Sequence, residues 1–206
     1  MSGKDIEFVR LAGEKVHSHL PEVARLRIAV FREWPYLYDG DFEYENNYLR
    51  TYAASPGSII VAAVDANTGE VVGAATGVPM SDADEAVRGV FTAAGYDPRE
   101  WFYHGESVLL PAYRGRGIGV RFFREREAQA RALGCRHAAF CGVIRSADDP
   151  RRPPGYVPLD DFWRRRGYTP MPGMECAFSW KELGATEEKA FPLAFWRKEL
   201  GDAEPV

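Results

Sequence analysis

A glycine-rich segment flanked by arginines is the part of the chain whose residue types and spacing most clearly indicate chemistry. An apolar stretch ends near residue 110, R-G-R-G-I-G follows over residues 114–119, and an amphipathic run comes next. Glycine lets a backbone approach a ligand without a Cβ in the way, and the first N–H groups of a following helix lack partners inside that helix. These donors, the helix dipole and the arginines all favour an anion. The segment therefore predicts a phosphate-binding site.

The spacing of the glycines excludes the two commonest phosphate-binding motifs. A dinucleotide fingerprint needs G-x-G-x-x-G, but counting from Gly115 the third glycine would fall on Val120. A P-loop needs G-x-x-x-x-G-K-[S/T], and the chain has no G-K-[S/T]. The pattern that is left is R-x-x-G-x-G, which begins at Arg114. A different phosphate-ligand enzyme on an unrelated α/β fold stays open as an alternative.

The elements that must position this segment can be read from periodicity and turn residues. Alternating or continuous apolar runs predict strands at residues 5–11, 58–65, 70–78, 101–110, 137–144, 174–180 and 191–198. Helical spacing and caps predict helices from Pro21, from an N-cap at Asp41, from a capping box at Ser81–Asp84, after the glycine-rich turn, and at 159–166. The order β-α-α-β-β-α-β-α-β-α-β-β predicts an α/β (α+β) fold.

Composition excludes several classes of protein. The chain has 206 residues, 46% of them hydrophobic and 27% charged, with a net charge of −4. Such a chain is typical of one domain, here residues 1–206, and its acidity does not fit sequence-blind nucleic-acid binding. No apolar run reaches the length of about 20 residues that a membrane span needs, and residues 1–10 hold no apolar signal core. We therefore expect a cytoplasmic protein without nucleic-acid or membrane partners.

Cysteine and histidine spacing predicts neither a disulfide scaffold nor a metal site. The cysteines at positions 135, 141 and 176 are odd in number and form no C-x-x-C pair, which is typical of reduced thiols. His17 and His19 form an H-x-H pair, with no cysteine near them. Because metal sites normally need three or four clustered ligands, we expect exposed histidines here and no metal.

The motif at Arg114 resembles the acyl-CoA signature of the GNAT N-acetyltransferase superfamily. In that signature a strand and Pro-x-Tyr precede R/Q-x-x-G-x-G/A and a helix follows, and here the chain reads L-L-P-A-Y-R-G-R-G-I-G over 109–119. Downstream, D-F-W-R-R-R-G-Y over 161–168 is similar to the superfamily's short helix with its aromatic-x-x-x-Gly-aromatic ending. The resemblance extends over residues 5–198, although only 106–120 is specific. It implies a bacterial-type member with a mixed, mostly antiparallel central sheet flanked by helices.

The resemblance implies acetyl-CoA as the co-substrate. The backbone of residues 114–119 would hold its pyrophosphate, and the pantetheine arm would run beside the preceding strand. A strand N–H would polarise the acetyl carbonyl, and a neutral primary amine of a small molecule or peptide would attack it directly in a ternary complex. The residues implied in acetyl-CoA binding are Val108, Leu109, Leu110, Arg114, Gly115, Arg116, Gly117, Ile118 and Gly119.

Candidates for proton transfer lie on the strand before the glycines and near the last short helix. Glu106 is the first choice as proton acceptor, because it is a carboxylate on the strand that would meet the thioester. His104 would share its face if the strand is regular. The alternatives are that Glu106 pairs with an arginine of the 146–166 region and that His104 satisfies a buried carbonyl.

The proton donor is less well specified. Where many superfamily members have a tyrosine this chain has Trp163, whose indole N–H is not an acid near neutral pH. Tyr168, Tyr156 or solvent would then supply the proton. Cys141 is an alternative as a thiol nucleophile, although strand cysteines are more often small core residues. The missing tyrosine also keeps a non-catalytic acyl-CoA-binding or sensor module open as an alternative.

The acceptor is indicated only by patches of charge and aromatic residues. Residues 39–45 carry four acids among aromatic neighbours, which would favour a cationic amine, or form the solvated edge of a helix. The proline-rich segment 146–158 and the 81–100 region are further candidates for shaping the cleft. Edge strands near the C-terminus would allow a homodimer.

Overall fold

Seven β-rich runs pair into one sheet in the order β1-β2-β3-β4-β5-β7-β6. The computed structural model describes residues 6–11 and 19–201. Every neighbouring pair is antiparallel except β4 and β5, so the expected mixed, mostly antiparallel sheet is confirmed. The strands are β1 (Ile6–Leu11), β2 (Ile59–Asp65), β3 (Val71–Pro79), β4 (Trp101–Leu109), β5 (His137–Val143), β6 (Thr169–Lys181) and β7 (Glu188–Glu199).

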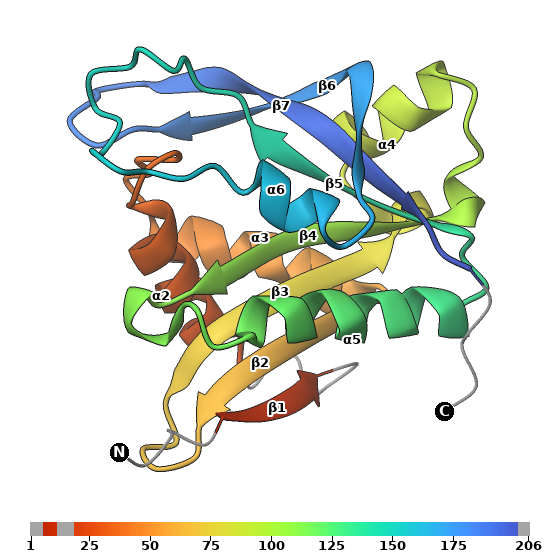
Figure 1. The fold of residues 1–206 in the computed structure, drawn as a ribbon, viewed down its shortest axis with the longest axis horizontal. Coiled ribbons are helices and arrows are strands. Elements are labelled where there is room, and N and C mark those ends of the chain that lie inside the picture. Colours follow the sequence, from red (N-terminus) through yellow and green to blue (C-terminus); the bar gives the residue numbers. More distant parts are fainter. Residues whose placement is uncertain (1–5, 12–18, 202–206) are drawn as a thin grey trace.

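Helices cover both faces of this sheet (Figure 1). One face is covered by α2 (Leu20–Phe31), α3 (Phe42–Ala54) and α4 (Glu85–Ala93), whose apolar residues join one core cluster. The other face carries α5 (Ile118–Ala132) and α6 (Asp160–Arg164), which pack on a second cluster. The sheet therefore separates two cores. Among the described residues no helix is long and apolar enough to cross a membrane.

The element order expected from the sequence is confirmed, with one local correction. The helix expected after Ser81 begins only at Glu85, because residues 80–82 form a 3-10 turn and the side chain of Asp84 caps the helix by accepting from the N–H of Ala86 at 2.8 Å. The expected capping box at Ser81 is therefore wrong. The cap expected at Asp41 is confirmed, since its carboxylate accepts from Tyr44 N–H. The expected first residue of the opening strand, Asp5, lies outside the described residues.

Two irregularities of β4 position the site. The strand pairs with β5 only over residues 101–103, and beyond them the two parallel strands diverge (Figure 1). In addition, the register with β3 shifts, so that His104 faces Gly77 but Ser107 faces Ala75. The strand thus gains one residue, a β-bulge, over 105–106. A bulge re-aims the side chains that follow it.

Arg126 of α5 fills the space behind the bulge. Its guanidinium is buried and donates to the carbonyl oxygens of Thr76 at 3.2 Å and Glu106 at 3.0 Å. Position 105 must be glycine here, because a Cβ would collide with the hydroxyls of Tyr52 and Thr76. Both features hold the bulge in one conformation.

Candidate active site

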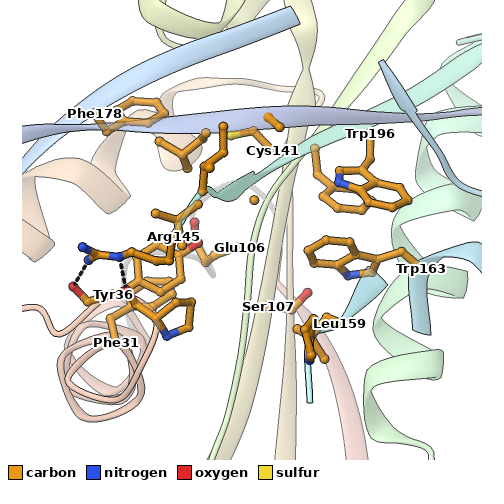
Figure 2. A pocket seen from close by; sticks show the side chains of 18 of the residues that line it. Phe31, Tyr36, Glu106, Ser107, Cys141, Arg145, Leu159, Trp163, Phe178 and Trp196 are labelled. Atoms are coloured by element: carbon orange, nitrogen blue, oxygen red, sulfur yellow. Dashed lines mark hydrogen bonds between the residues drawn. The ribbon is translucent and has the colours of Figure 1, made fainter. Parts of the chain in front are cut away.

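A cavity of about 770 Å³ is lined by residues from both faces of the sheet where β4 and β5 diverge. Its size is in the range of about 300–1,000 Å³ that is usual for small-molecule sites. Figure 2 shows Phe31, Tyr36 and Arg145 on one side of it and Trp163 and Trp196 on the other, with Glu106 between. We call these the α2 side and the α5 side.

The glycine-rich turn at the start of α5 forms an open cradle. Gly115 and Gly117 have φ of 78° and 80°, a left-handed conformation that side-chain-bearing residues rarely adopt. A Cβ built on either glycine would meet no atom within 4 Å, so the space above the turn is free for a ligand. Gly117 is the N-cap of α5, and no side chain accepts from the first turn. The first N–H groups of α5 are therefore available to an anion.

The arginines of the cradle are only partly free. Arg114 pairs with Glu33 at 2.9 Å and donates to the carbonyl of Leu109 at 3.2 Å, which ties the turn to the end of α2. Arg116 donates to the carbonyl of Ala112 at 2.8 Å and has no carboxylate partner in the described part of the chain. Of the two, Arg116 is better placed to meet an added negative charge.

One edge of β4 is open where the resemblance requires a binding edge. Toward β3, Val108 and Leu109 face Ala74 and Gly73, and the N–H of Leu110 donates to Val72 at 3.0 Å. Toward β5, residues 104–110 have no strand partner within the described residues. Unpaired backbone groups on a strand edge can bind another extended chain with amide groups. This edge of β4 is therefore open to an extended ligand with amide groups.

A buried triad of charges lies on the α2 side. The guanidinium of Arg27 bonds the carboxylate of Glu45 and pairs with Oε2 of Glu106 at 2.7 Å. All three side chains are almost completely buried. Burial lowers the pKa of Arg27, but the acidic groups around it, Glu106 first, outweigh burial and hold that pKa well above its usual value. Arg27 therefore stays charged between the two carboxyl groups.

Each carboxylate of the triad keeps one oxygen without a donor. Oε2 of Glu106 also accepts from the hydroxyl of Tyr48 at 3.2 Å, but Oε1 of Glu106 and Oε1 of Glu45 are buried with no hydrogen-bond partner among the described residues. Both residues line the cavity. Buried acceptors normally find a donor, so these oxygens are suited to a ligand that brings N–H groups.

His104 and Glu106 lie on opposite faces of β4. In a regular strand, residues two apart would lie on the same face, so the expected shared face is wrong. The bulge reverses the alternation, and the ring of His104 contacts Phe123 and Tyr168 under α5. Both ring nitrogens are buried without a partner in the described structure. Burial first, then the charge of Arg126, lowers the pKa of His104 well below its usual value. His104 is thus neutral.

The geometry does not bring Tyr168 to the cavity. Tyr168 is buried beneath α5, where its hydroxyl donates to Glu127 at 3.1 Å, and it is not among the lining residues. Burial and the nearby Glu127 raise its pKa well above the usual value. Tyr156, in contrast, lines the cavity, as does Trp163 at the position of the superfamily's usual tyrosine.

Comparison with known proteins decides the family. The profile of the Acetyltransferase (GNAT) family matches residues 23–152, more than half of the chain. The chain belongs to this family. None of the curated proteins matches the sequence.

Solved structures share the fold at low sequence identity. A proposed acetyltransferase from Acinetobacter baylyi is 15% identical, with 97% of this chain and 94% of that one covered at a TM-score of 0.64. A ribosomal-protein-alanine N-acetyltransferase from Brucella melitensis is 16% identical, with 93% and 99% covered at 0.59. A phosphinothricin acetyltransferase from Sinorhizobium meliloti, solved in complex with acetyl-CoA, is 16% identical, with 98% and 93% covered at 0.59. These likenesses show the GNAT fold.

The acidic segment of this GNAT protein does not form a free cation-binding surface. Asp39 pairs with Lys181 at 2.8 Å, Asp41 caps α3, and Glu45 bonds Arg27. Of its four acids, Glu43 alone has no partner in the described structure, and it does not line the cavity. The segment instead supplies one buried carboxylate, Glu45.

Arg145 fixes the loops around the α2 side. Its guanidinium donates to the carbonyl oxygens of Pro35 at 2.7 Å and Tyr36 at 3.1 Å (Figure 2), and it pairs with Glu182 at 2.6 Å. These contacts join the segment after α2, the end of β5 and the β6–β7 turn. The walls of this side are therefore preformed.

A thiol also faces the cavity. Cys141 of β5 lies 3.2 Å from the hydroxyl of Tyr103, measured from Sγ to Oη, and is hydrogen-bonded to the thiol of Cys176. The bond from Cys176, helped by that from Tyr103 and opposed by burial, lowers the pKa of Cys141. The cysteines are unpaired thiols, as expected. No three potential metal ligands gather among the described residues, and His17 lies outside them.

Sequence reasoning missed Arg27 and the pairing of Glu45 with it, although a signal for the pair exists. Arg27 lies four residues after Val23 and four before Phe31, on the apolar stripe of α2. Glu45 lies on the stripe of α3 that continues through Tyr48. A charge of each sign inside two neighbouring apolar stripes predicts a buried ion pair between the helices.

Proposed function

We propose that the protein transfers an acetyl group from acetyl-CoA to the primary amine of a small molecule, by direct attack in a ternary complex. The observation that carries this proposal is Glu106, which lines the cavity where β4 and β5 diverge and whose buried Oε1 has no donor in the described structure. The free cysteines are in keeping with a cytoplasmic enzyme.

The cradle and the open edge of β4 would bind the co-substrate, which supplies an acetyl group activated as a thioester. The turn over 114–119 offers backbone N–H groups to the pyrophosphate, and Arg116 adds a positive charge. The open edge over 104–110 offers amide partners to the pantetheine arm. Glycine at 115 and 117 leaves the room that this binding needs.

Glu106 would accept the proton that the amine must lose. The amine enters as an ammonium and donates one proton to Oε1 of Glu106. Its neutral nitrogen then attacks the acetyl carbon, so that the C–N bond forms as the C–S bond breaks, and water takes the second proton that the nitrogen must lose to become an amide. The leaving thiolate takes its proton from water or from Tyr156, which lines the same cavity. Arg27 and Tyr48 hold Oε2 of Glu106 and so aim Oε1 at the amine.

A thiol-release assay with a panel of primary amines tests the proposal. Glu106→Gln should lower kcat by about a hundredfold or more and flatten the acidic limb of the pH profile, with the KM for acetyl-CoA unchanged. Glu45→Gln is the matched comparison, because it removes the other carboxylate of the triad, and it should cost less than about tenfold.

Two outcomes would contradict the proposal in different ways. Unchanged rates of Glu106→Gln across about pH 6 to 9 would remove Glu106 from proton transfer. Binding of CoA without thiol release for any amine would instead identify a non-catalytic acyl-CoA sensor, which the tryptophan at position 163 favours.

A further inference from the structure

The α2 side of the cavity is walled by aromatic rings. The rings come from the end of α2, the segment after it, the 144–159 loop and β6, and they are Phe31, Trp34, Tyr36, Tyr156, Phe178 and Trp180. Several of them pack on one another, as Tyr36 does on Trp180 with ring centres 5.7 Å apart. Because such walls offer no hydrogen-bond partners over most of their area, they suit a ligand with an apolar body.

Most arginines that line the cavity are already balanced. Arg27 is held by two carboxylates, Arg145 pairs with Glu182, and Arg164 pairs with Asp161 at 3.1 Å and with Asp160 at 4.0 Å. None of these three arginines needs a ligand to neutralise it.

Arg152 is different. It lines the cavity and is partly buried, but no carboxylate lies within ion-pair distance of it among the described residues. Its guanidinium has only long contacts, 3.4 Å to the carbonyl of Ala147 and 3.5 Å to that of Tyr156, and it lies 5.6 Å from the centre of the Tyr156 ring. An arginine stacked on an aromatic ring keeps its planar set of donors ready for a carboxylate.

The surroundings of Arg152 favour a contact with the acceptor molecule over a contact with the phosphates of acetyl-CoA. Tyr156, on which it stacks, packs edge-on against Trp34 with ring centres 6.2 Å apart. Trp34 belongs to the segment after α2, which Arg145 fixes beside the aromatic walls. The phosphate cradle, by contrast, is formed by the start of α5.

We propose that the acceptor is a primary amine whose apolar body ends in a carboxylate, and that Arg152 binds this carboxylate. The proposal rests on the proposed function, since the amine of the same molecule would meet Glu106. The acceptor site then has an acidic group for the amine, aromatic walls for the body and a cation for the far end.

The test compares acceptors that differ only in this charge. The probes are para-(aminomethyl)benzoate and para-(aminomethyl)benzamide, with aminocaproate and its amide as a flexible pair. In the wild type, kcat/KM for the better carboxylate should exceed that for its amide by about tenfold, the gain of one charge-assisted hydrogen-bonded pair. In Arg152→Gln this ratio should fall to about one, and Arg152→Lys should keep part of it.

Arg151→Gln is the matched control. Arg151 is the neighbouring arginine, but it pairs with Asp149 and Glu182 and does not line the cavity, so the ratio should stay near the wild-type value. The KM for acetyl-CoA should be the same in all four proteins.

Each other outcome overturns the proposal. Equal rates for carboxylates and amides in the wild type, or a ratio that Arg152→Gln leaves intact, would show that Arg152 binds no acceptor carboxylate. A raised KM for acetyl-CoA in Arg152→Gln with the ratio unchanged would assign Arg152 to a CoA phosphate. Turnover of amines without charge preference leaves the proposed function standing. If no amine tested gives thiol release, both proposals are wrong.

Discussion

The two sides of the cavity are built from different material. At the start of α5, where Gly119 lines the cavity, the groups offered to a ligand are backbone N–H groups of one continuous turn, residues 114–119, with Gly115 and Gly117 in the left-handed conformation. On the α2 side they are side chains that come from three elements, Arg27 of α2, Glu45 of α3 and Glu106 of β4. The first site depends on local conformation and the second on packing between distant segments.

This difference predicts how each side responds to change. A backbone site keeps its donors whatever side chains flank it, provided that the turn keeps its conformation. A buried charge cluster holds only when all partners are present, because a charge left alone in the interior loses its compensation. Variants can therefore separate loss of binding from loss of stability.

The largest effect should come from removing the centre of the triad. In Arg27→Met, Glu45 and Glu106 lie buried side by side without a cation, so we expect the free energy of unfolding to fall by about 3–5 kcal/mol. Urea denaturation of the purified variant measures the loss.

Arg114→Met is the matched comparison for an exposed pair on the α5 side. Arg114 also bonds a glutamate, Glu33, but both side chains are more than two-fifths exposed, so solvent screens the pair and the loss should stay below about 1 kcal/mol. Equal losses in the two variants would show that the triad is no more than a surface-like ion pair.

The next effect concerns the cradle. In Gly117→Val, a β-branched residue must adopt a φ near 80°, and its side chain fills the space above the turn. We expect acetyl-CoA binding to weaken by about a hundredfold, or roughly 2.7 kcal/mol. Isothermal titration with CoA measures this change.

Gly95→Val separates strain from binding. Gly95 ends α4 with a φ of 83°, also has open space at its Cβ position, and lies outside the glycine-rich turn at the start of α5. Both variants should lose about 1–3 kcal/mol of stability from strain. Only Gly117→Val should lose CoA affinity, and equal affinity in the two variants would exclude the cradle.

The same contrast explains what could be predicted from the sequence. The turn over 114–119 is local, so its glycines and the helix after it are enough to indicate a phosphate site from residue types and spacing alone. The strands and helices follow likewise from periodicity and caps, with two exceptions. At Ser81 the 3-10 turn delays the helix to Glu85, and β6 begins at Thr169, before the alternating residues that start at Met174.

The place of Glu106 on the α2 side could not be predicted, because it depends on register. One extra residue in β4 turns Glu106 away from His104 and toward Arg27, and no local pattern in the strand signals that bulge. Tyr168 shows the same limit, since its place beneath α5 beside Glu127 follows from packing. Its candidacy as an acid came from the sequence motif alone.

A smaller effect tests the burial of His104 by pH. Its folded pKa is lowered, while the unfolded chain should have a value of about 6.5. As the pH falls below about 6.5, His104 becomes protonated in the unfolded state but not in the folded state. The free energy of unfolding therefore decreases until the pH reaches the lower pKa of the folded state. His104→Leu should remove this loss, which amounts to at most about 1.4 kcal/mol per pH unit.

The measurement is urea denaturation at several values between about pH 7.5 and 5.5, compared between variant and wild type. His137→Leu serves as the control, because burial also lowers the pKa of His137, but that side chain is only partly buried. Its effect on the slope should be smaller. Identical slopes in the wild type and His104→Leu would mean that the imidazole is solvated in the folded protein.

The smallest effect should follow from removing the thiol that faces the cavity. Cys141 is hydrogen-bonded to Tyr103 and Cys176, and its lowered pKa would suit a nucleophile. Direct transfer of the acetyl group to the amine nevertheless leaves this thiol no covalent role. Cys141→Ala should therefore change kcat by less than about threefold, and intact mass after incubation with acetyl-CoA should show no acetyl group on the wild-type protein. An acetylated Cys141 together with a large loss of kcat in Cys141→Ala would replace direct attack by a two-step transfer through the thiol. In that case the chemistry would lie on β5, and Glu106 would act only on the second step, when the amine attacks the acylated cysteine.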